Sequence, residues 1–374
     1  MTLRQLWLRL HRWTALSIGW LLVLSGFTGA VLVAAQPLDQ WWRDDLFQAR
    51  TPGPPQAPLQ ALVERARAEF GPATTLTIRP VREASESLRI LVRGSWSGTL
   101  YLDPVTGAEQ GRRGENEGFL NSLFKLHSAL WLQETGKAIL AIAALIYLLL
   151  LTTGLVLWWP RRWPPSWRIA LDRGLLRALF DLHRVGGAAL GLFIAVSVAS
   201  GAYMAWRPLG GFVSALAGAA PSTPPRLPPL QASAAAPTAP TAPTVDALAA
   251  TAQARFPQAP IGYIQLPARA DRPVRVRLQL PDDPHPNGLS SVWLDPRNGR
   301  VLAVQRWSEL DPGASAVAWV YPLHTGVLGG LWLELAVAAG GLVLATLGVS
   351  GIWLWWRRRA VHRRAPMAAL RQNP

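Results

Sequence analysis

Residues 10–29 read LHRWTALSIGWLLVLSGFTG, and residues 182–201 read LHRVGGAALGLFIAVSVASG. Both stretches begin with Leu-His-Arg, continue as a long apolar run, and match without a gap. Small and polar residues that recur at fixed distances from a histidine indicate an internal repeat. The matched positions are His11 and His183, Gly19 and Gly191, Ser25 and Ser197, and Gly29 and Gly201.

A second match is centred on His127 and His324, which lie in LHS and LHT. It continues through Gly154 and Gly351, Trp158 and Trp355, Trp159 and Trp356, Arg161 and Arg358, and Arg162 and Arg359. The sequence therefore predicts one unit present twice, and each copy is a helix, a soluble segment and a second helix. Because each copy starts and ends on the same side of a membrane, the two repeats have parallel topology.

The composition is that of a membrane protein, with 50% hydrophobic residues, 16% charged residues and 19 Trp among 374 residues. Spanning the bilayer takes about 20 apolar residues in a helix. Four stretches are long enough, and the first, although basic residues precede it as in a signal peptide, is interpreted as a retained span. The four predicted spans are 13–35, 138–159, 185–206 and 331–356.

The net charge of +15 comes from arginines that gather beside the ends of these spans. This is the positive-inside pattern, and it predicts a multi-pass membrane protein with both termini and the 160–182 loop in the cytoplasm. Nucleic-acid binding is the weaker interpretation of these charges. The chain has no cysteine, which excludes disulfides, iron–sulfur clusters and covalently attached c-type haem.

Two segments are then predicted to lie on the outer face of the membrane, and each contains one helical pattern followed by about three alternating strand patterns. Each is expected to be a small α+β module, beside a bundle of four transmembrane helices.

LDP followed by Gly recurs at Asp103 and Asp295, and we interpret both aspartates as structural β-turn residues. The predicted parts are a first helix at 1–36, module 1 at 37–125, a second helix at 126–160, a cytoplasmic loop at 161–182, a third helix at 183–207, a Pro/Ala-rich linker at 208–245, module 2 at 246–322, a fourth helix at 323–357 and a basic tail at 358–374.

Four of the six histidines occupy matched positions, and a pseudo-twofold axis along the membrane normal would pair them. Singly, each histidine is better explained as an interfacial residue or a helix cap than as a ligand. As two symmetric pairs they indicate bis-histidine ligation of two b-type haems within a helix bundle. The inner pair would be His11 and His183, and the outer pair would be His127 and His324.

Further residues are assigned around these pairs. Arg12 and Arg184 each follow a proposed ligand and could pair with haem propionates, although the positive-inside pattern explains them equally well. His285 and His362 have no counterpart and are interpreted as surface residues. If the helix after His127 were straight, this histidine would lie about 15 Å above Lys137, which predicts an outer haem at or above the membrane boundary.

The motifs LHRWTALSIGWLLVLSGFTG, LYLDPVTG, VWLDPRNG, GLVLWWPRR and GIWLWWRRR resemble the PepSY-associated transmembrane family. Within it, the four-helix inner-membrane ferric-siderophore reductases are the most similar. The resemblance implies PepSY-like periplasmic modules and two haems held by His11, His127, His183 and His324. It also implies an oxidoreductase that passes electrons to a ferric siderophore in the periplasm.

No flavin- or nicotinamide-binding segment follows the fourth helix, so the donor is left open between a cytoplasmic partner and a quinol. The competing hypothesis is a non-redox protein, anchored in the lipid bilayer, whose modules bind an envelope partner. It leaves the histidine symmetry unexplained. An ion or proton transporter is disfavoured because the spans lack acidic residues at mid-depth.

Overall fold

The computed structural model of the chain describes residues 2–160, 163–219, 224–228, 242–269 and 271–369, with side chains up to residue 360. The chain divides into a helical unit (1–35, 123–213 and 323–374) and a sheet unit (36–122 and 214–322). Most of the predicted linker, the end of the basic tail and the side chain of His362 lie outside the described residues.

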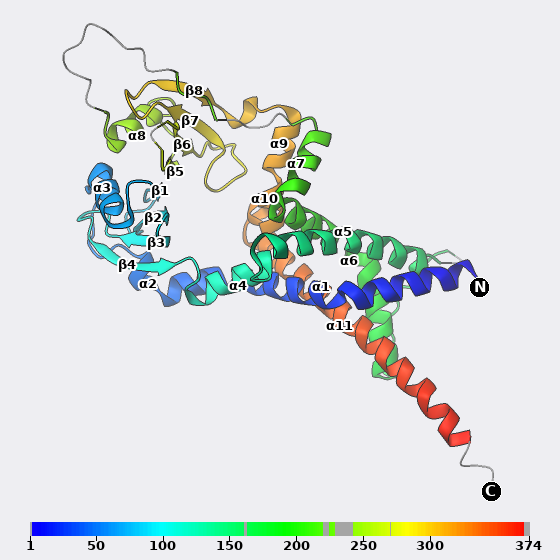
Figure 1. Cartoon of the computed structure of the whole chain (residues 1–374). Coiled ribbons are helices and arrows are strands. Elements are labelled where there is room, and N and C mark those ends of the chain that lie inside the picture. The colour runs from blue at the N-terminus through cyan, green and yellow to red at the C-terminus, as the bar shows by residue number, and fades with distance from the viewer. Residues whose placement is uncertain (1, 161–162, 220–223, 229–241, 270, 370–374) are drawn as a thin grey trace, which may run out of the picture. The chain divides into compact units, whose positions relative to one another are not determined.

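Helices make up most of the described residues of the helical unit, and Figure 1 labels them in chain order. Their bounds are α1 Leu3–Trp42, which continues into the sheet unit, α4 Gly118–Ala129, α5 Gln133–Trp158, α6 Leu175–Ala205, α7 Arg207–Leu216, α10 Val320–Thr325 and α11 Gly330–Ala369, with short 3₁₀ turns at Leu171–Arg173 and Val327–Gly329.

Four helices of the described chain are long and apolar enough to cross a membrane, namely α1, α5, α6 and α11. A helix satisfies its own backbone hydrogen bonds, so it can present apolar side chains to lipid without exposing backbone polar groups. Large apolar side chains such as Leu192 and Trp332 are exposed on these helices. These positions suit contact with acyl chains.

The four helices pack around small residues. A Cβ atom at Gly26 of α1 would lie 2.5 Å from the carbonyl oxygen of Gly341 in α11. A Cβ atom at Gly341 would in turn lie 2.5 Å from the carbonyl oxygen of Gly26. Such close backbone approach is a usual packing mode in membranes, where small residues replace the hydrophobic driving force. Apolar side chains from all four helices complete the core, among them Leu22, Tyr147, Ile194 and Leu344.

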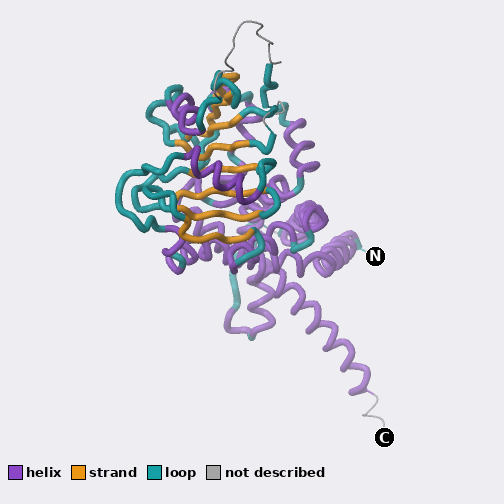
Figure 2. The backbone as a smooth tube through the Cα atoms, turned by 60° about the vertical axis from the view of Figure 1, so that its left-hand side comes forward, coloured by secondary structure: helices purple, strands orange, loops and turns teal. Residues whose placement is uncertain are grey.

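The sheet unit is built on one eight-stranded antiparallel sheet, in the order β4-β3-β2-β1-β5-β6-β7-β8. The strands are β1 Thr75–Arg79, β2 Leu88–Arg93, β3 Ser97–Leu102, β4 Glu109–Gly114, β5 Ile261–Leu266, β6 Val274–Leu278, β7 Ser290–Leu294 and β8 Val301–Gln305. The remaining helices are α2 Asp44–Phe47, α3 Leu59–Phe70, α8 Val245–Gln253 and α9 Pro312–Ala318, with a 3₁₀ turn at Trp307–Glu309. Figure 2 shows the strands side by side with helices lying over them.

Each of the two soluble segments predicted from the sequence contributes four strands to this sheet, β1–β4 and β5–β8, whereas the sequence predicted about three in each. The additional strands, β4 and β8, are the two edges of the sheet. An edge strand pairs on one side only and need not bury a regular set of side chains. The sequence EQGRRG of β4 therefore has no alternating pattern that would reveal it.

The two segments also join into one sheet, because β1 pairs with β5 through Leu76–Leu266, Thr77–Gln265 and Ile78–Ile264. Their buried side chains form a single hydrophobic cluster with α3 and α8 on one face of the sheet. Asp246 of α8 accepts hydrogen bonds from the backbone N–H groups of Leu59 and Gln60 at 2.8 and 2.9 Å. A carboxylate that caps the start of α3 from the other segment links the two halves further.

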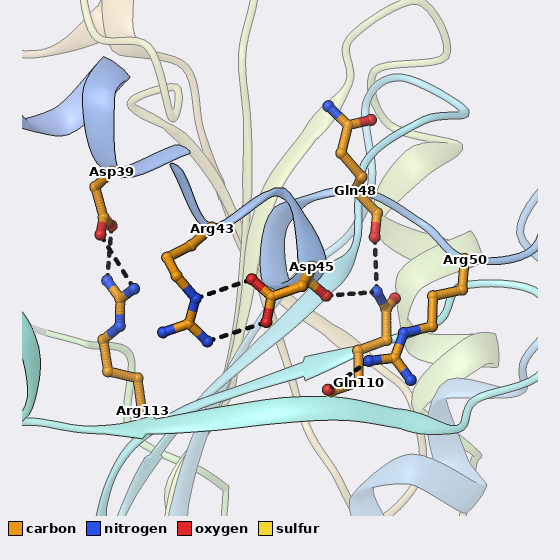
Figure 3. Close-up of polar contacts among 7 residues, drawn as sticks. All are labelled: Asp39, Arg43, Asp45, Gln48, Arg50, Gln110 and Arg113. Carbon is orange, nitrogen blue, oxygen red and sulfur yellow. Dashed lines mark hydrogen bonds and ion pairs between the residues drawn. The ribbon is translucent and has the colours of Figure 1, made fainter. Parts of the chain in front are cut away.

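Polar contacts fix the chain that leaves α1 onto the edge strand β4 (Figure 3). Arg113 donates to Asp39 through two nitrogens at 2.7 and 3.1 Å, and this ion pair is largely buried. The side-chain amide of Gln110 donates to the carbonyl oxygens of Asp45 and Gln48. A bidentate guanidinium–carboxylate pair fixes orientation as well as distance, so residues 36–50 have a defined path along the edge of the sheet.

Both LDP motifs form the β-turns that the sequence predicted. The Asp103 carboxylate accepts hydrogen bonds from the N–H groups of Thr51, Val105 and Thr106. Asp295 accepts from the N–H and guanidinium of Arg297. Gly107 and Gly299 close the turns at φ +71° and +74°, where glycine carries no steric penalty. The aspartates are therefore structural.

Replacing Asp103 with Asn is expected to destabilise the sheet unit by about 1–3 kcal/mol at neutral pH, because a buried charge-assisted acceptor is weakened. Burial opposes ionisation, but the hydrogen bonds from Thr106 and Thr51 prevail and lower the pKa of Asp103 from 3.8 to about 2. Its contribution is therefore complete above pH 3.8 and is lost as the pH falls toward 2.

Thermal unfolding at several pH values measures this effect. The deficit of the Asp103→Asn protein relative to wild type should shrink between pH 4 and 2. Asp282→Asn, at an exposed loop position, is the control and should leave stability nearly unchanged. A deficit that is constant across this pH range would contradict the assignment.

Candidate functional site

The four matched histidines meet in two pairs. The ring centres of His11 in α1 and His183 in α6 are 6.4 Å apart, with the planes nearly perpendicular at 87°. The ring centres of His127 in α4 and His324 in α10 are 6.3 Å apart, with the planes at 35°. Each pair joins one histidine from the first half of the chain with one from the second, as the sequence predicted.

The structure differs from the straight helix assumed for His127. Helix α4 ends at Ala129, and Leu130 and Trp131 between α4 and α5 adopt positive φ of 50° and 60°, as does Gln133, the first residue of α5, at 54°. The carbonyl of Ala129 occupies the space where a Cβ of Gly136 would lie, so the end of α4 packs directly against the start of α5. The expected rise of about 15 Å above Lys137 is therefore wrong, because the chain turns back.

The second half turns in a similar way. Helix α10 ends at Thr325, and Gly326 and Gly330 adopt φ of +82° and +59° before α11. A Cβ at Gly326 would lie 2.7 Å from the backbone of Glu334, so this turn also folds closely onto the following helix. In both halves the break separates the histidine from the long apolar helix, and the imidazole reaches a neighbouring helix of the helical unit.

The outer pair is held through Nδ1. The Nδ1–H of His127 donates to the carbonyl oxygen of Ser25 in α1 at 3.1 Å, and that of His324 donates to the carbonyl of Ser197 in α6 at 2.9 Å. The Thr28 hydroxyl lies 3.1 Å from Nδ1 of His127, and the Ser200 hydroxyl lies 3.2 Å from Nδ1 of His324. A carbonyl oxygen can only accept, so Nδ1 carries the proton in both rings.

The inner pair is held in an equivalent way. Nδ1 of His11 lies 2.9 Å from the hydroxyl oxygen of Thr153 in α5, and Nδ1 of His183 lies 3.1 Å from that of Ser350 in α11. The Thr153 hydroxyl donates its own proton to the carbonyl of Leu150, and Ser350 donates to Leu347. Nδ1 is therefore the donor here too, and all four rings present the lone pair of Nε2.

A glycine lies beside each imidazole. A Cβ on Gly29 or Gly201 would lie 2.9 or 2.7 Å from Cε1 of His127 or His324. A Cβ on Gly154 or Gly351 would lie 3.3 or 3.2 Å from Cε1 of His11 or His183. Each glycine directly follows a hydroxyl residue in the sequence. In the inner pair this hydroxyl accepts the Nδ1 hydrogen bond, and in the outer pair it lies beside Nδ1. The local element is thus a Thr/Ser-Gly pair on one helix that receives a histidine from another.

These pairs fit the axial ligands of a haem. With metal–nitrogen bonds of about 2 Å and about 1.2 Å from nitrogen to ring centre, two imidazoles on opposite sides of one metal have ring centres about 6.4 Å apart. Within the described residues, no group of three or more metal-ligating side chains occurs. Two imidazoles suffice where a porphyrin supplies the other four nitrogens, whereas a structural zinc site needs four protein ligands.

Beside Ser350, a partly open apolar groove of about 380 Å³ lies in the surface of the helical unit. It is bounded by residues of α1, α6 and α11, including Val23, Leu179, Ala345 and Trp353. Ser350, whose hydroxyl accepts the hydrogen bond of His183, also lines it. Because the lining includes the hydroxyl that is hydrogen-bonded to His183, the apolar surface suits contact with part of a flat, largely apolar porphyrin.

The comparison with known proteins agrees with this architecture. A family model described as the PepSY-associated TM region matches residues 8–358. The chain belongs to this family. No curated protein matches it.

The matched region of this PepSY-associated transmembrane protein includes all four paired histidines and the membrane-spanning segments that carry their partners. The family therefore accounts for the membrane architecture. The roles of the imidazoles rest on the geometry described above.

The two arginines assigned to propionates differ in their surroundings. Arg184 donates to the carbonyls of Ser166 and Arg168 and lies 3.5 Å from the fully buried Asp181. Its guanidinium is therefore engaged in holding the loop before α6. Arg12 forms no hydrogen bond or ion pair with the part of the chain that the structure describes. The assignment stays a prediction for both, and Arg12 has the more available guanidinium.

His285 lies in the sheet unit, stacked on Tyr321 with ring centres 4.6 Å apart, and is only partly exposed. It is not part of either pair.

The sequence predicted the histidines and glycines of the site and matched Ser25 with Ser197, but it did not identify the four hydroxyl groups that lie next to Nδ1 of the histidines. Ser25 and Ser197 were matched between the halves, yet their role as carbonyl acceptors depends on helix packing. Thr28 and Ser200 directly precede Gly29 and Gly201, and Thr153 and Ser350 directly precede Gly154 and Gly351. A hydroxyl residue before each of these four glycines is the sequence signal that marks these positions.

Gly201→Ala is expected to destabilise the helical unit by about 1–3 kcal/mol, because the new methyl group overlaps the His324 ring. Gly187→Ala on the same helix is the matched control, since no atom lies within 4 Å of its Cβ position. The control should be neutral or stabilising. Thermal unfolding in detergent, followed by circular dichroism, measures both, and equal midpoints for the two variants would contradict the packing described here.

Proposed function

We propose that this protein is a dihaem b-type membrane reductase that moves electrons across the bacterial inner membrane to an iron(III) chelate, such as a ferric siderophore, in the periplasm. The observation that carries the proposal is the pairing of four imidazoles, all with Nδ1 donating and Nε2 free. His11 and His183 would hold one haem, and His127 and His324 the other. A haem held in this way supplies reversible one-electron chemistry.

The surrounding residues support this assignment through what they do to the imidazoles. An Nδ1–H that donates to an oxygen fixes the tautomer and the ring orientation and makes Nε2 a better ligand. Ser25, Thr153, Ser197 and Ser350 supply the acceptors in this chain. Two axial imidazoles also fill both open positions of an iron, which favours electron transfer over oxygen binding.

The positions of the pairs along the helices support transfer across the membrane. Gly29, which contacts His127, follows His11 by 18 residues on α1, or about 27 Å of helix at 1.5 Å per residue. The hydrocarbon core is about 30 Å thick, so one site alone would leave most of it to be crossed in a single step. Two sites divide the distance.

Several finer features belong to the same proposal. The matched histidines, glycines and hydroxyl residues support an origin as two parallel repeats related by an axis along the membrane normal. The arginines of residues 4–12, 168–177 and 357–359 support a cytoplasmic location for both termini. The segments 37–125 and 246–322 would then be the periplasmic PepSY-like modules.

Release of iron would follow from its change of valence. Iron(III) is a hard cation that siderophores bind through oxygen, and iron(II) is held less tightly by such ligands. One electron per iron is sufficient, so the protein need only dock the chelate and deliver the electron. The donor is a cytoplasmic protein or a quinol.

Absorption spectroscopy of the purified protein is the first test. A pyridine haemochrome assay is expected to give two b-type haems per chain, and His324→Ala should give one. His183→Ala should also give one, because it removes a ligand of the other pair. His285→Asn, outside both pairs, is the control and should retain two.

The outcome that would sink this proposal is a colourless protein with intact helical content, which would favour the non-redox anchor. Loss of both haems in a folded His324→Ala protein would contradict the pairing.

Electron delivery is tested in proteoliposomes with an iron(III) chelate outside and an iron(II) indicator. With an internal reductant, wild type should form external iron(II), and both His183→Ala and His324→Ala should lose most of this activity. With a reductant placed outside instead, His183→Ala should keep reducing the chelate, because the outer pair is intact. Equal rates for both variants under both conditions would contradict the assigned order.

A further inference from the structure

The face of the sheet opposite α3 and α8 carries a row of arginines. Ile78, Ile90, Ile264 and Val276 are fully buried against the helices, so the residues next to them point to the other face. Arg79 is directly opposite Arg89 across β1 and β2, and Tyr263 is directly opposite Arg277 across β5 and β6. The β1–β5 register joins the two pairs into one row. We call Arg79, Arg89, Arg275 and Arg277 the arginine face.

These arginines lack compensating charges. Within the described residues, no carboxylate forms an ion pair with any member of the arginine face. Their protein partners are neutral, since Arg277 donates to the Tyr263 hydroxyl at 3.0 Å and Arg275 to the Ser291 hydroxyl at 3.0 Å. Like charges directly opposite each other on a sheet are destabilising. A structural role alone does not account for this arrangement.

One guanidinium has an unused donor in a buried place. Nε of Arg277 is buried and has no hydrogen-bond partner. A buried donor without an acceptor is costly, and natural proteins seldom keep one without a function. The Arg275 guanidinium lies 4.8 Å from the ring centre of Trp293, which holds it against the sheet. Contacts with Trp293 and the Tyr263 hydroxyl thus hold two guanidinium groups of the arginine face in place against the sheet.

The loop before β7 borders the same region. Burial, together with Arg277 and Arg79, lowers the pKa of His285 to about 4, so this ring is neutral at neutral pH and reports positive potential around it. Asp283 lies in this loop, and its oxygens accept hydrogen bonds from the backbone N–H groups of His285 and Leu289. His285 stacks on Tyr321, so an aromatic surface stands beside the positive charges.

We infer that the arginine face is the docking site of the iron(III) chelate and that it selects anionic chelates with carboxylate oxygens at their periphery. This inference rests on the proposed reductase function. Strands lie about 4.8 Å apart, so the row from Arg89 to Arg277 extends over about 14 Å, which suits a small chelate with several outward carboxylates. Guanidinium groups bind carboxylates through two parallel hydrogen bonds, which gives orientation as well as affinity.

Binding can be measured without any electron transfer by using gallium(III) citrate, because gallium(III) is not reduced under these conditions. Isothermal titration of the full-length protein in detergent is expected to show binding that weakens as salt is raised. The double variant Arg79→Gln/Arg277→Gln should bind at least about tenfold more weakly, since two charge-assisted contacts are removed. Its unfolding temperature should be unchanged or higher, because like-charge repulsion is relieved.

The matched control is Arg255→Gln/Arg300→Gln, which removes the same charge from exposed positions of the sheet unit outside the strands of the row. It should bind gallium(III) citrate as wild type does. Equal weakening in both double variants would overturn the site, because net charge alone would then explain it. Binding of metal-free citrate as tightly as the gallium complex would overturn the assignment to a chelate.

The two proposals fail in different ways. A protein that binds gallium(III) citrate through the arginine face but holds no haem keeps the docking site and loses the reductase. A protein that contains two haems and reduces a neutral ferric hydroxamate, yet does not bind gallium(III) citrate, keeps the reductase and loses the anion site. The double variant should still reduce the neutral hydroxamate at the wild-type rate while its rate with ferric citrate falls.

Discussion

The hydrogen bond donated by each imidazole Nδ1–H is the interaction on which the candidate site depends. It fixes a proton on one ring nitrogen, and only then does the other nitrogen keep a free lone pair for a metal. The acceptors are carbonyls of Ser25 and Ser197 and hydroxyls of Thr153 and Ser350. All of them lie on membrane-spanning helices, where no water competes for the donor.

This constraint explains features that otherwise look unrelated. The glycines beside the rings leave room for them, and the hydroxyl residues before those glycines are held in turn by their own helix backbone. The left-handed residues Leu130, Trp131 and Gln133 are unfavourable conformations, yet they let α4 turn back so that His127 reaches α1. Backbone strain of this kind is commonly found where a site needs a particular geometry.

The sheet unit follows a different principle. Its helix-covered face is an ordinary apolar core shared by both halves of the chain. Its other face places like charges side by side and leaves a buried donor without a partner, which costs stability. Deviations from the most stable arrangement often mark function, and the row of like charges on this face is one of them. An anionic ligand would supply the missing charges and acceptors.

The sequence by itself determined the four apolar helices, the matched histidines and glycines and the two aspartate turns, because these depend on local composition and on fixed spacing. It could not reveal the edge strand Glu109–Gly114, which buries no regular pattern, or the Thr28, Thr153, Ser200 and Ser350 hydroxyls, whose role needs a second helix. Only the tertiary structure decided that β1 joins β5 in one sheet and that His127 turns back beside α1. Both depend on contacts between residues far apart in the chain, and such contacts leave no periodic trace in a single sequence.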